Sequence, residues 1–553
     1  MKLISAPRAW PVAVAFLLTF LSLGRNTEAA LQVAIASDEV RFSWPPGGPP
    51  TIAIRELPMH TRADLAAERR TLWTGAARAG AAAVPRREAG RDRLYARFEL
   101  FDPATGEALG DPQYVTDFSA LAVREHALKR PTGKKGLACI VDLDDVRALG
   151  VQHANENIDI AGLLDWSNPT PALSFEFEGR KVGLHAGGVR TLDTLIKGKS
   201  DLGISVIGIL LNYVKRAPGE AVPGVPYGAV GSPLVHPLTN PALVPSGPAA
   251  FNTATAEGLF FYRAITQWLI ERYTQPEEKF GRLTGLVVGN EIQSHWGWYH
   301  LGEATDDEVL REYLVALRVA DLAARSTHRD FRIYLSMEHH WAMRGEKGNP
   351  RRAMRGVDML ANVAERARRE GDFPWQVAFH PYPEDLFKPR FWQDQTAPLS
   401  FDAPRITFNN LEVLVQFLHQ PQYLYRGQAR HIALTEQGFN CPQEPDGEQA
   451  QAAAFAFALK RVEAMPEIES FIYHRHVDHP NEGGLRLGLR EHDDTSKNLE
   501  AMGRKRLLYE VFQKAGTPEE AATFAFALPI IGRENWEHLV ADPSAVKPAA
   551  AAK

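Results

Sequence analysis

The sequence has few cysteines and no large excess of charge of either sign. Its 553 residues include two cysteines, Cys139 and Cys441, which cannot form a disulfide framework or a four-cysteine zinc site. Both a disulfide between them and two free thiols fit their wide spacing. The 62 basic and 67 acidic residues give a net charge of −5, which offers no electrostatic reason to bind nucleic acid. With 45% hydrophobic and 23% charged residues, the composition excludes disorder for most of the chain.

Long hydrophobic runs are also missing, except at the N-terminus. Lys2 and Arg8 lie at the start of the chain, an apolar run covers residues 10–23, and Ala29 follows it. A charged start, a short apolar centre and a small-residue exit are typical of a secretory signal peptide, here over residues 1–29. The run is shorter than the ~20 residues that a membrane span needs, and an uncleaved anchor is the alternative. We therefore expect a secreted or periplasmic protein with no membrane contact after signal cleavage.

The remaining chain shows two successive patterns. Residues 31–120 hold short apolar stretches between turns rich in proline and glycine, which predicts a small N-terminal β-rich domain similar to a β-sandwich. Residues 135–515 alternate short apolar strands with helical patterns, and this length of about 380 residues suits an α/β fold of the (β/α)8 TIM-barrel type. Residues 516–542 are expected to form a C-terminal extension. The low-complexity residues 543–553 are expected to form a flexible tail.

Seven strands of the predicted barrel can be read from the sequence. They are expected over residues 151–160, 204–211, 283–288, 331–337, 376–379, 431–435 and 470–473. We expect the missing third strand within the proline-rich residues 223–251. A doubly wound sheet is the competing fold, but no glycine-rich phosphate turn follows the first strand.

Polar residues follow the apolar strands at the end where barrel enzymes place their active sites. The fourth strand ends in Asn290 and Glu291, the sixth in His380 and Tyr382, and the seventh in Glu436. Glu291 and Glu436 are expected to face each other across the barrel mouth. Glycoside cleavage needs two carboxyl groups that flank the sugar bond, because one donates a proton while the other attacks the anomeric carbon or activates water.

The Asn290–Glu291 pair and Glu436 resemble the catalytic motifs of the clan A glycoside hydrolases, which are retaining (β/α)8 enzymes. More narrowly, the chain looks like a secreted bacterial branch long described as a domain of unknown function. The resemblance implies that Glu291 is the acid/base, that Glu436 is the nucleophile and that Asn290 binds the sugar 2-hydroxyl. It also implies that Tyr382, in a His-x-Tyr motif, places its hydroxyl on Glu436. The clan commonly has proline after the first glutamate, where this chain has Ile292.

Aromatic and histidine side chains are expected to line a sugar pocket, because flat apolar faces suit pyranose rings. Trp296 and Trp298 follow Glu291 closely, and Trp341 follows the fifth strand. The tryptophan usual on strand eight of the clan is absent, and histidines lie there instead. The predicted substrate-binding residues beside Asn290 and Tyr382 are therefore Trp296, Trp298, Trp341, His380, His474 and His476.

Two other functions are open at this stage. A metal-dependent barrel hydrolase would use polar residues at the strand ends. Its candidate ligands are Glu338, His339, His340, His380, His474, His476, Asp478 and His479. Adjacent His339 and His340 argue against it, because neighbouring residues of a strand point to opposite faces. The other alternative is a barrel that holds glycan without cutting it.

The two glutamates favour an enzyme over both alternatives. We predict a secreted retaining glycoside hydrolase with a two-glutamate double-displacement mechanism. Its partner is an oligosaccharide or polysaccharide, expected to be β-linked, and not a nucleic acid. The chemistry requires no metal and no other cofactor.

Overall fold

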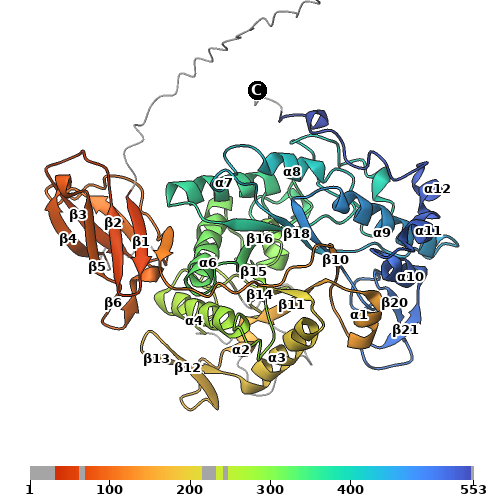
Figure 1. Ribbon diagram of the computed structural model, residues 1–553, viewed down its shortest axis with the longest axis horizontal. Coiled ribbons are helices and arrows are strands. Elements are labelled where there is room, and N and C mark those ends of the chain that lie inside the picture. Colours follow the sequence, from red (N-terminus) through yellow and green to blue (C-terminus); the bar gives the residue numbers. More distant parts are fainter. Residues whose placement is uncertain (1–30, 61–68, 215–231, 241–246, 550–553) are drawn as a thin grey trace, which may run out of the picture.

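The computed structural model describes residues 31–60, 69–214, 232–240 and 247–549. Eight parallel strands close into a barrel covered by helices, which confirms the predicted TIM-barrel fold (Figure 1). In barrel order the strands are β10 (Lys135–Leu137), β11 (His153–Asp159), β14 (Ser205–Leu211), β15 (Gly285–Val288), β16 (Arg332–Glu338), β17 (Trp375–His380), β18 (Ile432–Gln437) and β19 (Ile468–Tyr473).

The first barrel strand differs from the sequence prediction. β10 has three residues, Lys-Gly-Leu, which are too few to show an alternating pattern. A side chain at Gly136 would come within 2.9 Å of the His153 carbonyl oxygen, so glycine allows β10 to approach β11. The expected third strand within residues 223–251 is wrong, because β14 takes the third place in the closed barrel. The two strands predicted as first and second are therefore second and third.

Helices join the strands and cover the outside of the barrel (Figure 1). The α-helices are α1 (Leu143–Leu149), α2 (Ile160–Leu163), α3 (Ala186–Asp201), α4 (Ala256–Tyr273), α5 (His295–Trp298), α6 (Asp306–Thr327), α7 (Gly356–Arg369), α8 (Glu412–Leu418), α9 (Gly447–Glu463), α10 (Leu507–Lys514), α11 (Glu520–Phe524) and α12 (Ala527–Ile531). At the start of α6, Thr305 and Glu308 each bond to the other's backbone N–H in a capping box. This local signal fixes where α6 begins, and α6 packs on β16.

Two small sheets precede the barrel and lie to one side of it (Figure 1, red and orange). One sheet has the strand order β5-β2-β1-β9 and the other β4-β3-β8. Their strands are β1 (Gln32–Ala36), β2 (Glu39–Ser43), β3 (Thr51–Leu57), β4 (Arg70–Ala76), β5 (Ala81–Pro85), β8 (Arg97–Phe101) and β9 (Asp117–Ala120). Phe42 of β2 and Phe98 of β8 lie with ring centroids 5.0 Å apart, so the sheets share an apolar core. The Tyr95 hydroxyl donates to Gln267 of α4 and ties this region to the barrel.

Three antiparallel strand pairs lie outside the barrel and the two N-terminal sheets. They are β6 (Arg87–Glu88) with β7 (Arg91–Asp92), β12 (Leu173–Phe177) with β13 (Arg180–Leu184), and β20 (Arg490–His492) with β21 (Met502–Lys505). The β20–β21 pair lies next to the loop after β19, because Arg490 of β20 forms a β-bridge with Val477 of that loop.

The C-terminal residues pack back onto the barrel loops. α11 and α12 lie within the predicted 516–542 extension. Farther on, the Lys547 backbone hydrogen-bonds to Leu399 and Phe401, so this part of the expected flexible tail is held in place. The predicted signal peptide lies outside the described residues. No helix among the described residues is long and apolar enough to cross a membrane.

Candidate active site

Two glutamates meet at the C-terminal mouth of the barrel. Glu291 follows β15, and Glu436 lies near the end of β18. A carboxylate oxygen of each lies within 4.8 Å of the other, and a ring nitrogen of His380 lies within the same distance of both. The carboxyl groups of retaining glycosidases are about 5–5.5 Å apart, and those of inverting enzymes about 6.5–9.5 Å. A closest oxygen–oxygen approach within 4.8 Å fits the shorter of these two spacings.

Glu291 is a buried carboxyl group in a strained backbone position. Its φ angle is 43°, in the left-handed region that favours glycine, and its N–H donates to the Ser336 hydroxyl at 2.9 Å. Burial raises the pKa of Glu291 to about 7, and the charges of Glu436 and Glu338 act in the same direction. A carboxyl group that keeps its proton near neutral pH can act as a general acid.

His380, the last residue of β17, contacts both Glu291 and the neighbouring strand β18. Its Nδ1 lies 2.8 Å from Glu291 Oε1, and its Nε2 lies 3.0 Å from the Thr435 hydroxyl. Burial lowers the pKa of His380, but the bond to Glu291 and the charge of Glu436 outweigh this, so the net shift is upward. His380 is 1% exposed, and its ring contacts Glu291 and Thr435 rather than solvent. It therefore positions Glu291, and its contact with a substrate stays a prediction.

Glu436 is less buried than Glu291 and bonds to Tyr382. The Tyr382 hydroxyl donates to Glu436 Oε1 at 3.1 Å, the contact that the clan A resemblance implies. Burial and the Glu436 charge raise the pKa of Tyr382 well above its ordinary value, so this hydroxyl keeps its proton and remains a donor. The bond fixes one oxygen of Glu436, and the half-buried carboxylate stays accessible at the mouth.

Two asparagines present amide groups at the mouth. Asn290 is half-buried beside Glu291, and its side chain makes no hydrogen bond to another described residue. On β11, Asn155 reaches across the barrel interior to donate to the Thr435 carbonyl oxygen at 2.7 Å. Asn157 lies two residues farther along β11, on the same face, and is exposed. Asn290 and Asn157 are therefore placed to bind polar groups of a ligand.

The three predicted tryptophans have different surroundings. Trp341 is 0% exposed, its indole N–H donates to the Phe401 carbonyl oxygen, and its ring packs edge-to-face on Phe417. The prediction that Trp341 lines the pocket is wrong, because this ring packs the loop after β16 against α8. Trp296 is half-buried with a guanidinium group over its ring, and Trp298 is 45% exposed. Trp298 has the open face that a sugar ring needs.

The two predicted histidines after β19 also differ. The His476 ring is fully buried, and its Nε2 lies 3.2 Å from the Asp145 carboxylate at α1. The prediction that His476 contacts substrate is therefore wrong, because it joins β19 to α1. His474 is half-buried at the mouth, between Cys139 and Glu482.

The histidines of the metal alternative do not gather in one place. Two groups with metal-ligand spacing occur in the described part of the chain: Glu338 with His339 and His340, and Glu291 with His380 and Glu436. Neither group includes a histidine from the loop after β19. The second group is the pair of glutamates with the histidine that positions Glu291.

Glu338 is a third carboxylate beside the pair. It accepts hydrogen bonds from the Ser294 hydroxyl at 2.8 Å and from the His340 backbone N–H at 2.8 Å. Burial raises the pKa of Glu338, but its bonds to His340 and the charge of His339 outweigh this and lower the pKa to about 2. Glu338 therefore stays ionised, and its charge helps Glu291 to keep its proton.

A family model matches residues 127–539, which include the whole barrel. The chain belongs to the family of unknown function DUF5722. This confirms the resemblance to a domain of unknown function. No curated protein matches the DUF5722 chain.

The DUF5722 chain is also similar to solved structures of glycoside hydrolases. A family 39 glycoside hydrolase from Bacteroides cellulosilyticus WH2 is 13% identical, with a TM-score of 0.42 over 89% of this chain and 83% of that one. A family 1 β-glucosidase from Thermotoga maritima is 12% identical, with a TM-score of 0.42 over 67% and 84%. A β-xylosidase from Caulobacter crescentus CB15 is 12% identical, with a TM-score of 0.37 over 70% and 69%. These similarities are too distant to bear on activity.

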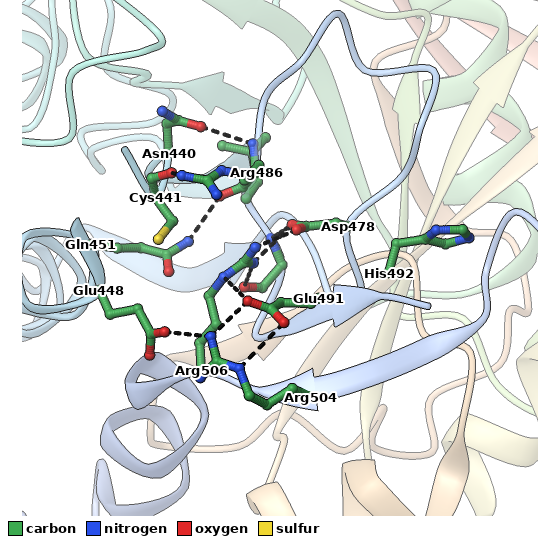
Figure 2. A network of polar contacts seen from close by, with 12 residues as sticks. Asn440, Cys441, Glu448, Gln451, Asp478, Arg486, Glu491, His492, Arg504 and Arg506 are labelled. Carbon is green, nitrogen blue, oxygen red and sulfur yellow. Dashed lines mark hydrogen bonds and ion pairs between the residues drawn. The ribbon is translucent and has the colours of Figure 1, made fainter. Parts of the chain in front are cut away.

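The loop after β19 is held at the mouth of the DUF5722 barrel by a network of charged residues (Figure 2). Asp478 and Arg506 form a buried ion pair at 2.5 Å. Farther along the same loop, the Arg486 guanidinium donates to the Cys441 carbonyl oxygen. These contacts fix the loop on both sides of Glu482.

Three residues at the mouth of the DUF5722 barrel were not among the pocket residues predicted from the sequence. Glu338 was considered only as a metal ligand, although a carboxylate at the end of the fifth strand lies next to Glu291 by topology. Asn157 lies inside a strand whose place in the barrel was predicted one position too early. Cys139 follows β10, which no pattern revealed.

Proposed function

We propose that the protein is a retaining glycoside hydrolase that cleaves a β-linked glycan. One observation supports this function above the others: the carboxyl groups of Glu291 and Glu436 approach within 4.8 Å in different environments. Glu291 is buried and has its pKa raised to about 7, whereas Glu436 is half-buried and bonded by a tyrosine hydroxyl. A proton donor beside an accessible carboxylate is what double displacement requires.

In the first step, Glu436 attacks the anomeric carbon and forms a glycosyl ester. The bond to the leaving oxygen breaks, and Glu291 gives that oxygen its proton. In the second step, Glu291 takes a proton from water, the water oxygen attacks the anomeric carbon, and Glu436 leaves as a carboxylate. Tyr382 holds Glu436 in place, and His380 holds Glu291.

The polar and aromatic groups around the pair suit a sugar. The Asn290 amide lies next to the acid/base and makes no hydrogen bond to another described residue, so we assign it to a hydroxyl group of the sugar at the site of cleavage. The exposed face of Trp298 provides a stacking surface farther out, because it follows Glu291 by seven residues on a short helix. We assign Trp296 to the same stacking surface as Trp298.

The test begins with a panel of aryl β-glycosides and β-glycans, which identifies a substrate. Glu436→Ala then abolishes turnover, because no glycosyl ester can form. Glu291→Ala retains ester formation from an activated aryl glycoside, and the ester accumulates because the general base is also missing. Added azide restores turnover of Glu291→Ala with retained configuration. In Glu436→Ala, azide attacks the substrate directly and gives the opposite configuration.

The anomeric configuration of the two azide products decides the assignment. Equal configurations from both variants contradict the roles given to Glu291 and Glu436. A loss of turnover smaller than about a hundredfold in either variant also contradicts these roles, because general acid–base catalysis contributes at least about that factor. Glu257→Ala is the matched control, since this glutamate pairs with Arg180 on the outer surface and its loss leaves turnover unchanged.

A further inference from the structure

A cysteine, a histidine and a glutamate form a second chain of polar contacts at the barrel mouth. Cys139 Sγ lies 3.6 Å from His474 Nδ1, and His474 Nε2 lies 3.1 Å from Glu482 Oε1. Cys139 follows β10, and the other two residues follow β19, the adjacent strand of the barrel. A nucleophile within reach of a base, with the base oriented by a third group, is the arrangement of activated nucleophiles.

The charges around His474 favour its protonated form. Burial lowers the pKa of His474, but Cys139, Glu482 and Glu436 outweigh this and raise it well above its ordinary value. The other groups that face this cluster are Arg475, which pairs with Glu482, and Tyr382 on the loop after β17. A proton on His474 places a positive charge 3.6 Å from Sγ.

The backbone and the exposure of Cys139 also differ from those of a structural cysteine. Its φ angle of 50° lies in the left-handed region, which is unfavourable for a residue with a Cβ, and Glu291 shares this backbone strain at the same mouth. Cys139 follows β10 at the mouth and is half-buried there. Cys441 is 4% exposed within the network of Figure 2, and burial raises the pKa of its thiol. The chain therefore contains its own unreactive reference thiol.

We propose that Cys139 is an activated nucleophilic thiol that reacts with soft electrophiles such as small disulfides at the barrel mouth. The Cys139 thiolate attacks one sulfur of the disulfide, a new S–S bond forms as the old one breaks, and His474 gives its proton to the leaving thiolate. The products are a mixed disulfide on Cys139 and one free thiol. This reactivity is independent of glycoside cleavage and is measured without a glycan.

Alkylation by iodoacetamide, followed by peptide mass mapping of the folded full-length protein, tests this reactivity. The reaction joins Sγ to carbon and releases iodide. Between about pH 8 and about pH 6, an ordinary thiol slows roughly 50–100-fold, because its thiolate fraction falls. We expect Cys139 to slow by less than about fivefold over this range and Cys441 to remain unlabelled until the protein is unfolded.

Two variants test whether His474 causes the weak pH dependence of Cys139 alkylation. His474→Gln keeps a polar side chain but carries no proton charge, so Cys139 should regain the pH dependence of an ordinary thiol. Glu482→Gln, in which His474 loses its carboxylate partner, should give an intermediate profile. Circular dichroism confirms that each variant is folded, and Glu482→Gln provides the test if His474→Gln does not fold. An ordinary pH profile for Cys139 in the parent protein, or unchanged profiles in the folded variants, overturns the proposal.

A small symmetric disulfide, hydroxyethyl disulfide, tests the reaction itself. We expect one adduct on Cys139 that a reducing thiol removes, and no adduct in Cys139→Ser. The absence of an adduct on the parent protein overturns the proposed disulfide exchange.

Discussion

At the residue scale, the site gives two chemically identical side chains different tasks. Glu291 lies deep against His380 and under the charges of two other carboxylates, so it holds its proton. Glu436 lies nearer to solvent and receives a hydrogen bond from Tyr382. Glycosidases divide the acid and nucleophile roles between two carboxyl groups through environments that differ in this way.

The pH dependence of activity follows from the raised pKa of Glu291. The acid must be protonated for the first step, so kcat/KM should fall as the pH rises through about 7. The bond from His380 lowers the pKa of Glu291, and His380→Gln should therefore move this fall to higher pH. Profiles of kcat/KM against pH for both proteins measure the shift. A fall centred near the ordinary glutamate value, or an unmoved profile in the variant, would contradict the acid role.

Tyr382→Phe removes one hydroxyl bond from the nucleophile. Hydrogen bonds to charged groups contribute about 1.5–3 kcal/mol, so kcat should fall by roughly 10–100-fold with the fold unchanged. Steady-state kinetics and a thermal melt measure the two effects. Tyr95→Phe is the control, because it also loses a hydroxyl bond, to Gln267, but lies between the sheets and α4. Equal losses of kcat in both variants would show that the effect is not specific to the site.

At the element scale, most of the barrel can be predicted from the sequence because buried parallel strands are short apolar runs. Such runs revealed the strands that carry Glu291, Glu436 and Tyr382. β10 could not be found, since three residues carry no pattern. The predictions for Trp341 and His476 failed for another reason. The end of a strand locates the backbone of the residues that follow it, but the path of the loop decides whether their side chains face the pocket or the core.

A buried ion pair joins α8, α9 and the C-terminal extension. Arg461 donates to both carboxylate oxygens of Glu412 at 2.7 Å, and the Ala541 N–H donates to Glu412 as well. Glu412→Ala leaves the buried guanidinium without its partner and should lower the free energy of unfolding by about 3–5 kcal/mol. Denaturant titration measures the loss. Arg147→Ala, which breaks an exposed pair, should change stability by less than about 1 kcal/mol, and similar losses in both variants would contradict the prediction.

At the scale of the whole molecule, the residues of the proposed reaction lie at one mouth of the barrel, away from the N-terminal sheets. The proposed chemistry uses side chains alone, so activity should survive extensive chelation. Assays before and after treatment with a chelator, with unfolding followed in parallel, check this. Activity that disappears while the fold persists, and returns with zinc, would favour a metal held by Glu291, His380 and Glu436 over the two-glutamate mechanism.

The short strand β10 makes the barrel unequal around its circumference. It aligns with β11 at one position and with β19 at three, whereas β11 and β14 align at seven. Few hydrogen bonds between strands must therefore break for the barrel to open locally at β10. Amide hydrogens of β10 should exchange with deuterium before those of β14, a difference that mass spectrometry can measure. Cys139 follows β10, so the part of the barrel that is expected to open most readily lies next to the thiol that we propose to be reactive.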